Sequence, residues 1–201
     1  MPNHLSTPDR LGHPAVVKSD KSLKTLWAGR LLDADLAAVR FISRSARSTI
    51  GRASAIGISK LGNGWLYPIL GAIILAWLGA AGFQVVVLGG LNALLLHCLF
   101  PFIKRRIGRP RPFRVDPQLS SLLAVLDEHS FPSGHTMTLS GVLVPIVLIW
   151  PAAVLSAIAL LCCMAWSRIA TAHHYPSDIF AGAILGIVLG YPLSMCVLAV
   201  W

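Results

Sequence analysis

The chain alternates between long stretches without any charged side chain and shorter polar segments. Residues 66–100, 136–167 and 179–201 contain no Asp, Glu, Lys or Arg. One membrane-spanning helix requires about 20 apolar residues, so the last stretch fits one crossing and each of the other two is long enough for two. The Gly-Ala-Ala-Gly sequence at 79–82 and Pro151 provide a break within each of the longer stretches. The pattern predicts an all-α, polytopic transmembrane bundle of about five membrane-spanning helices.

The composition agrees with a membrane protein and argues against a soluble one. Hydrophobic residues make up 55% of the 201 residues and charged residues 12%, about half of the usual charged fraction. A soluble helical protein would need polar faces on its apolar helices, and these stretches have none. The formal charge of +9 would suit a nucleic-acid binder, but the cations lie in the first 60 residues or beside the apolar stretches, and no nucleic-acid-binding motif is present. We therefore expect membrane lipids as partners and no nucleic acid, and the sequence indicates no protein partner.

The region before the first apolar stretch divides into two parts. Residues 1–22 contain several Pro, Gly and Ser residues with scattered charges, and we expect a flexible polar tail without a cleavable signal peptide. In residues 23–61, apolar side chains such as Trp27 and Leu36 recur at helical spacing between charged ones. This pattern predicts an amphipathic interfacial helical region in the headgroup plane or, equally, an amphipathic helix packed on the bundle. The membrane-embedded domain would then comprise residues 62–201.

Three polar segments are expected to meet on one face of the membrane. When each crossing is counted, the chain reaches the same face at 104–114, at 132–135 and at 167–178. Nearly every ionisable group beyond residue 60 lies in this layer. Charged side chains at membrane depth are costly, so such a collection is interpreted as a functional site.

The residue types in this layer suit the binding and transfer of phosphate. Arg and Lys side chains provide cations that match phosphate oxygens, and Ser133, Gly134 and His135 begin a helix whose free backbone N–H groups favour an anion. His135 and His174 lie on different segments and supply a nucleophile and an acid. Asp178 follows His174 by four residues, one helical turn, so its carboxylate can accept the second ring N–H of His174 and fix the tautomer.

A metal-dependent phosphatase is the weaker interpretation. A two-metal site needs several carboxylates, and few are available: Asp116, Asp127, Glu128 and Asp178. Zinc would require His129 and His173 as ligands in addition to the two histidines above. The four cysteines lie inside apolar stretches without zinc-ligand spacing, and we interpret them as small hydrophobic residues. We therefore expect neither a metal nor another cofactor.

The order and spacing of these residues resemble the three-part signature of the type 2 phosphatidic acid phosphatase superfamily, which includes glucose-6-phosphatases and vanadium haloperoxidases. The matching residues are Lys104, Arg111 and Pro112, then Pro132, Ser133, Gly134 and His135, then Ser167, Arg168, His174 and Asp178. The resemblance covers roughly residues 62–201. It implies that His174 attacks phosphorus and forms a phosphohistidine, that His135 protonates the leaving oxygen, and that Asp178 orients His174. It also implies a set of phosphate-binding residues: Lys104, Arg111, Ser133, Gly134 and Arg168.

Other polar residues near the signature are expected to have different roles. Four arginines fall outside it and are interpreted as cations that flank the membrane or bind headgroups: Arg105, Arg106, Arg109 and Arg114. Three residues lie close enough to touch a substrate but are not expected to be catalytic: Asp127, Glu128 and His129. His173 lacks the spacing of His174, and His97, inside a crossing, is expected to be packed and hydrogen-bonded.

The sequence therefore predicts an integral-membrane enzyme that hydrolyses a lipid phosphate or a polyprenyl diphosphate. A phosphotransferase that passes the phosphoryl group to a lipid or sugar hydroxyl would share the first half of the mechanism and is the alternative. A haloperoxidase is disfavoured because that chemistry belongs to soluble members, and a scaffold would usually lack one of the signature histidines or the aspartate. Phosphatidic acid, phosphatidylglycerol phosphate, polyprenyl phosphates and lipid A all remain open as substrates.

The charged residues beside the first crossing indicate which side of the membrane the active site faces. Arg47, Arg52 and Lys60 precede it with no acid among them, and the basic loop after Ile103 lies on the same face, whereas the opposite face carries no charge. By the positive-inside rule, the active site and the N-terminus would face the cytoplasm of a bacterial inner membrane. Against this, many enzymes that the chain resembles work on the extracytoplasmic face.

Overall fold

The computed structural model describes residues 20–125 and 127–200, with side chains from residue 29 onward. The helices are α1 (Asp20–Ser43), η1 (Arg44–Arg47), α2 (Thr49–Gly62), α3 (Leu66–Leu78), α4 (Ala81–Ile107), α5 (Pro112–Val115), α6 (Gly134–Ile149), η2 (Pro151–Ala153), α7 (Val154–Ala170) and α8 (Pro176–Leu198). No strand occurs in the described part, which confirms the all-α prediction. The chain divides into two compact units, Met1–Asp33 and Ala34–Trp201, and all features below belong to the second.

Both predicted breaks within the apolar stretches are present. α3 ends at Gly79, whose φ of +56° is a left-handed conformation that glycine adopts without strain. Pro151 begins the short η2 turn between α6 and α7, because proline has no N–H to continue the preceding helix. The apolar stretches therefore form five separate helices, α3, α4, α6, α7 and α8.

The helices differ in how well they suit a membrane crossing. Among the described residues, three segments are long and apolar enough to span: α4, Pro151–Ala170 and α8. A fourth span is possible if α2 and α3, which meet at a bend of 75°, are counted as one broken span, and α6 is a shorter apolar helix. The polytopic helical bundle is thus confirmed, while the count of five crossings remains a prediction.

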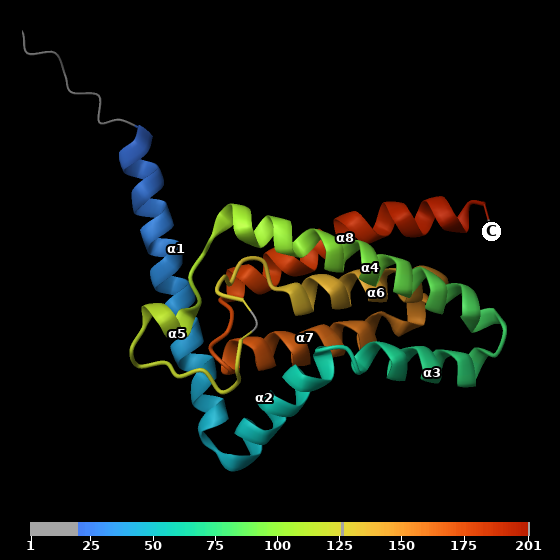
Figure 1. Ribbon diagram of the computed structural model, residues 1–201, viewed down its shortest axis with the longest axis horizontal. Coiled ribbons are helices and arrows are strands. Elements are labelled where there is room, and N and C mark those ends of the chain that lie inside the picture. The colour runs from blue at the N-terminus through green and yellow to red at the C-terminus, as the bar shows by residue number, and fades with distance from the viewer. Residues whose placement is uncertain (1–19, 126, 201) are drawn as a thin grey trace, which may run out of the picture. The chain divides into compact units, whose positions relative to one another are not determined.

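α6 forms the core of the bundle and packs against α8, α4 and α7 (Figure 1). Its closest neighbour is α8, where Gly182, Gly186 and Gly190 face α6. A Cβ added at Gly186 would lie 2.0 Å from the Ser140 hydroxyl and 2.2 Å from the Met137 carbonyl. Only glycine allows this approach of the two backbones, as is common in membrane helix pairs. The two helices are therefore fixed against each other.

The predicted amphipathic region 23–61 is not one helix, because α1, η1 and α2 follow one another in it. Ser48 separates η1 from α2: its backbone is extended, and its hydroxyl accepts a hydrogen bond from the Gly51 amide at 3.1 Å and so caps α2. α2 packs against α7 (Figure 1) and buries Ala55 and Ser59. A position of α1 in the headgroup plane remains a prediction. The predicted tail lies outside the described residues except for 20–22, which begin α1.

Candidate active site

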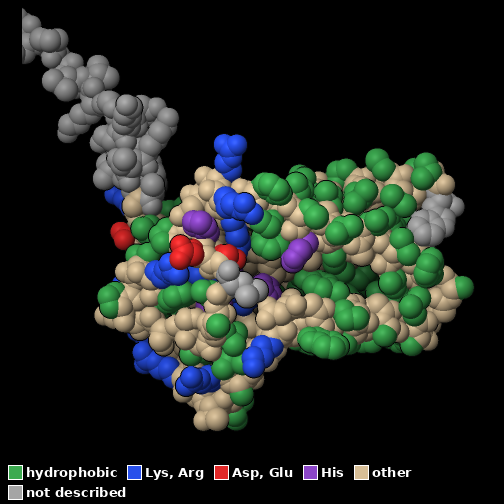
Figure 2. Space-filling model, in the orientation of Figure 1, with side chains coloured by type: hydrophobic (Ala, Val, Ile, Leu, Met, Phe, Trp, Pro, Cys, Tyr) green, Lys and Arg blue, Asp and Glu red, His purple; other side chains and the backbone are tan. Residues whose placement is uncertain are grey.

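The polar ends of the bundle helices meet at one end of the larger unit. The C-terminal ends of α4 and α7 and the N-terminal ends of α3, α6 and α8 lie there, so the five helices alternate in direction (Figure 1). Figure 2 shows that charged and histidine side chains gather at this end, while hydrophobic side chains cover the rest of the visible bundle face. The structure thus brings together the three polar segments, as the count of crossings predicted.

His174, the predicted nucleophile, lies in the buried turn between α7 and α8. Its Nε2 atom is 3.5 Å from Arg111 Nη1. Burial, together with the positive charges of Arg168, Arg111 and Lys104, holds the pKa of this imidazole well below its ordinary value of 6.5. The ring is therefore neutral near pH 7, and a neutral imidazole has the free electron pair that nucleophilic attack requires.

The contact between His174 and Asp178 is longer than the sequence suggested. The two residues are not on one helix, because α8 begins only at Pro176. His174 Nδ1 lies 3.6 Å from Asp178 Oδ2 and forms no hydrogen bond with the described residues. The carboxylate is still the nearest charged acceptor for this ring nitrogen, so the predicted orientation of the ring requires only a small approach.

Asp178 itself is held by groups that the sequence did not indicate. Its Oδ1 accepts a hydrogen bond from Arg109 Nη1 at 2.7 Å, and its Oδ2 accepts one from the Tyr175 amide at 2.9 Å. Arg109 also donates to Ser177 and lies over the Tyr175 ring, 3.8 Å from its centroid. Arg109, expected to flank the membrane, is instead part of the support of Asp178.

Three buried cations surround the His174 ring: Lys104, Arg111 and Arg168. Arg168 Nη1 donates to the Ser59 hydroxyl at 2.8 Å, and its Nη2 is 2.9 Å from His173 Nδ1. Its Nε atom is buried without a hydrogen-bond partner among the described residues. An unpaired buried donor costs about 1–3 kcal/mol, so this guanidinium suits an anionic ligand that supplies an acceptor.

Ser133 and His135 lie at the start of α6. The Ser133 amide donates to the Asp178 carbonyl at 3.1 Å, which joins this turn to α8, and the Ser133 hydroxyl is buried without a partner among the described residues. Gly134 is the first residue of α6, where backbone N–H groups have no partner within the helix. His135 Nε2 lies 2.8 Å from Asn63 Oδ1. No motif or spacing in the sequence indicates Asn63 as a contact of this histidine.

Asp127 occupies a more central place than expected. Its carboxylate contacts Lys104 Nζ at 2.9 Å and Arg111 Nη2 at 2.8 Å. Burial alone would raise the pKa of this carboxyl group, but the two cations outweigh that effect and lower it. The carboxylate is therefore charged at neutral pH and lies directly on two of the predicted phosphate-binding cations.

The neighbouring residues have supporting or peripheral positions. His173 is buried, with a pKa lowered to about 3 by burial and by Arg168 and Arg111, and it contacts Ser121 and Arg168. His97 is exposed on α4 and packs edge-on against Phe100, but the hydrogen bond expected for it is absent among the described residues. Two further groups lie at the exposed surface: Arg105 with Arg106, and the Arg114–Glu128 ion pair. Within the described ranges, no group of three His, Cys, Asp or Glu side chains is placed to hold a metal ion.

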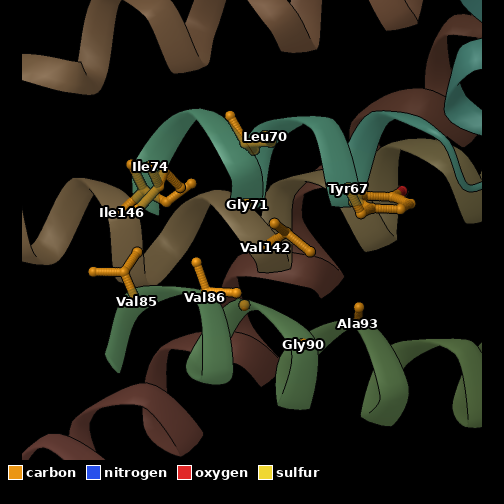
Figure 3. A pocket seen from close by; sticks show the side chains of 11 residues that line it. Tyr67, Leu70, Gly71, Ile74, Val85, Val86, Gly90, Ala93, Val142 and Ile146 are labelled. Carbon is orange, nitrogen blue, oxygen red and sulfur yellow. The ribbon is translucent and has the colours of Figure 1, made fainter. Parts of the chain in front are cut away.

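An apolar cavity of about 220 Å³ lies between α3, α4 and α6 (Figure 3). It is lined by Tyr67, Leu70, Gly71, Ile74, Val85, Val86, Gly89, Gly90, Ala93, Val142 and Ile146. On α6, Val142 and Ile146 follow His135 by about two and three helical turns, so the three residues share one face of the helix. On α4, Ala93 precedes Lys104 by about three turns. The cavity therefore continues the same helix faces that carry active-site residues, about 10–17 Å deeper in the bundle.

The sequence of this chain is similar to those of known phosphatases. The model of the PAP2 superfamily matches residues 82–201. The chain is 34% identical over 122 residues to a lipid A 1-phosphatase from Rhizobium johnstonii, covering 57% of this chain and 46% of the relative, so it spans about half of that relative's length. It is 32% identical over 157 residues to a decaprenylphosphoryl-5-phosphoribose phosphatase from Mycobacterium tuberculosis, covering 69% of this chain and 76% of the relative.

Solved structures share the helical fold. A transmembrane PAP2-type phosphatidylglycerolphosphate phosphatase from Bacillus subtilis superimposes with a TM-score of 0.59 at 22% identity, covering 93% of this chain and 91% of the other. LpxE from Aquifex aeolicus gives a TM-score of 0.58 at 23% identity, covering 79% of this chain and 93% of the other. Because the family model covers more than half of the chain and both structures have the same fold, the chain belongs to the PAP2 superfamily.

Proposed function

We propose that this protein is an integral-membrane phosphatase that removes phosphate from a lipid through a covalent intermediate on His174. The observation that carries the proposal is the buried, neutral His174 ring, whose Nε2 atom lies 3.5 Å from the Arg111 guanidinium. A neutral imidazole can attack phosphorus, and fixed cations beside it stabilise the charge on the phosphoryl oxygens in the transition state. The relatives named as phosphatases of lipid A and of a decaprenyl-linked sugar phosphate support a lipid substrate.

The reaction would proceed in two steps. In the first, His174 Nε2 bonds to phosphorus, the bond from phosphorus to the lipid oxygen breaks, and His135 donates its proton to that oxygen. In the second, His135 takes a proton from water, the water oxygen attacks phosphorus, and the bond to His174 breaks. The products are a lipid alcohol, or a lipid monophosphate from a diphosphate, and inorganic phosphate. Asp178 stabilises the His174 ring while that ring carries positive charge.

The phosphoryl group would be held by groups from four segments. Lys104, Arg111 and Arg168 supply buried positive charge. The unpartnered hydroxyl of Ser133 and the amide of Gly134 at the start of α6 donate to the oxygens. These groups include two of the buried donors that lack a partner within the described residues, which is why an anion suits this place.

The lipid chain would lie in the apolar cavity between α3, α4 and α6. Since His135 shares a face of α6 with Val142 and Ile146, a phosphate bound beside His135 directs its ester chain along that face into the cavity. Aliphatic and small residues line the cavity and offer an apolar chain contacts free of polar groups. The chemistry of this site therefore favours a phosphate on a long apolar chain, with phosphatidic acid, phosphatidylglycerol phosphate, polyprenyl (di)phosphate and lipid A as the candidates.

Phosphate release from purified protein tests the proposal. The four lipid classes are supplied in detergent micelles without an acceptor alcohol, and inorganic phosphate is measured. His174→Ala and His135→Ala should each lower turnover by a factor of about 10² or more, with unchanged elution from a sizing column. A His174→Ala protein that keeps a tenth of the rate contradicts the mechanism. A phosphorylated protein that releases no inorganic phosphate, and that transfers its phosphoryl group to an added lipid or sugar alcohol as a phosphate ester, identifies the phosphotransferase instead.

We also propose that the active site faces the cytoplasm of a bacterial inner membrane. Arg47, Arg52 and Lys60 are exposed on the segments that precede α3, at its active-site end, and such cations favour the cytoplasmic side. A reporter that is active only outside the cytoplasm, fused after Trp201, should be active in this orientation. A silent reporter, with a cytoplasmic fluorescent reporter active at the same point, reverses the orientation or changes the number of crossings.

A further inference from the structure

Asp35 of α1 lies against the active-site end of α8. Its carboxylate accepts hydrogen bonds from Arg109 Nη2 at 2.7 Å and from the Ser177 amide at 3.1 Å, and a further one from the Ser177 hydroxyl. The residue is only 5% exposed, although carboxylates are rarely buried without a specific partner. α1 precedes the part of the chain that the family model matches, 82–201, so the family signature assigns Asp35 no role.

Arg109 joins Asp35 to Asp178. One guanidinium nitrogen binds Asp35, and the other binds Asp178 Oδ1 at 2.7 Å. Burial opposes the charge on Arg109, but the two carboxylates outweigh it, so the pKa of Arg109 is raised and the side chain stays charged. One cation therefore serves two buried carboxylates, and the three groups together carry one net negative charge.

The place of that negative charge matters for His174. Asp178 Oδ2 lies 3.6 Å from His174 Nδ1. When Nε2 bonds to phosphorus, the imidazole gains positive charge, and its Nδ1–H becomes a stronger donor toward Asp178. A carboxylate that is fully paired with its own arginine would stabilise this ring less than one whose arginine is shared with a second carboxylate.

We propose that Asp35 is a positioning residue: by sharing Arg109, it leaves more of the negative charge of Asp178 available to His174 and keeps that carboxylate oriented toward the ring. The proposal rests on the phosphatase function proposed above. It gives α1 a direct part in the active site of this chain, since the arginine that holds Asp178 is itself held from α1.

A second ion pair provides a matched control. Arg40 of α1 contacts Asp116 at 2.5 Å, and Asp116, 3% exposed, is as buried as Asp35. Both pairs tie α1 to the segment that follows α4, but no hydrogen bond or ion pair of Asp116 within the described residues reaches Asp178. Asp35→Asn and Asp116→Asn therefore each remove one ion pair between α1 and this segment and retain the side-chain shape, while only the first changes the charge on the Arg109–Asp178 pair.

The kinetic experiment compares full-length wild type, Asp35→Asn and Asp116→Asn in phosphate release from the four lipid classes. For Asp35→Asn we expect kcat to fall about tenfold or more, with KM within a factor of about two, because substrate-binding groups are untouched. Asp116→Asn should retain a kcat close to that of wild type. An unchanged kcat in Asp35→Asn, or an equal loss in both variants, overturns the positioning role and leaves the phosphatase function standing.

If wild type releases no phosphate from any of the four lipids, the proposed function is refuted. The positioning role of Asp35 is then tested by a measurement that does not depend on turnover. Nitrogen-15 NMR of labelled histidine reports which ring nitrogen carries the proton, and His174→Ala identifies the signal of that ring. Wild type and Asp116→Asn should hold the His174 proton on Nδ1, toward Asp178. In Asp35→Asn the proton should shift in part to Nε2. An unchanged tautomer in Asp35→Asn refutes the positioning role whatever the activity.

Discussion

Replacement of Asp127 by asparagine should make the active site bind phosphate-like anions more tightly. The Asp127 carboxylate lies on Lys104 and Arg111, the same cations that are proposed to hold the substrate phosphate. An incoming anion must share these cations with the carboxylate or displace it. The Asp127→Asn variant would keep the shape of the side chain without its charge, so the anion would meet less competition.

The size of the effect follows from the geometry of the two ion pairs. Their lengths are 2.9 and 2.8 Å, but the Asp127 side chain is 39% exposed, so solvent screens both contacts. A solvent-screened pair contributes about 0.2–1 kcal/mol, and two pairs therefore about 0.4–2 kcal/mol. This corresponds to inhibition constants lower by about 2–30-fold. Because the pKa of Asp127 is lowered below its ordinary range, the carboxylate competes at any pH above that range.

The assay is competitive inhibition of lipid hydrolysis by vanadate, which can mimic the phosphoryl group in its transition state. Glu128→Gln is the matched control, since Glu128 is 73% exposed and pairs only weakly with Arg114 at 3.3 Å. It should leave the inhibition constant within a factor of about two. If Asp127→Asn leaves vanadate binding unchanged or weakens it, the carboxylate holds the cations in place rather than competing with the ligand.

Three further outcomes are expected. Arg111→Lys keeps the charge but loses the planar guanidinium, so the rate should fall, whereas exposed Arg105→Lys should leave it unchanged; equal effects would mean that the binding cations are misassigned. Dialysis against EDTA should not alter the rate, and a loss that zinc or magnesium restores would contradict the metal-independent chemistry. Gly186→Val should lower stability by about 1–3 kcal/mol, because its side chain overlaps α6; thermal unfolding in detergent measures this, with Gly57→Ala, whose added Cβ meets no atom within 4 Å, as control.

The sequence was sufficient to predict the helical bundle and the convergence of its polar ends. The lengths of the stretches without charged residues, together with the breaks at 79–82 and Pro151, define the apolar helices. Because successive helices alternate in direction, the polar segments between them then lie at the same end of the bundle. The lengths of the individual helices could not be predicted as well. α3 has 13 residues and α4 has 27, because α4 continues past the uncharged stretch through Lys104 to Ile107. A charged residue ends an apolar stretch, but it does not end a helix.

The supporting contacts of the site could not be predicted from local spacing. Arg109 and Asp35 are separated by 74 positions in sequence, and a cation beside an apolar stretch has the same pattern whether it faces headgroups or a buried carboxylate. Asp127 lies in an irregular loop, 23 positions from Lys104 of α4. Motif spacing predicts which residues act on the substrate, whereas the residues that contact and hold them are known only once distant segments are placed together.

Because of the glycine contacts between α6 and α8, substitutions at this interface and substitutions in the wall of the apolar cavity should have different effects in evolution. His135 lies in the first turn of α6, Asp178 lies in the first turn of α8, and the amide of Ser133 donates a hydrogen bond to the Asp178 carbonyl. A substitution at this helix interface would alter the distance between His135 and Asp178, the residues proposed to act in the reaction. The α3 wall of the apolar cavity lies outside this helix pair, so substitutions there can change the proposed lipid site while His135 and Asp178 keep their relative positions.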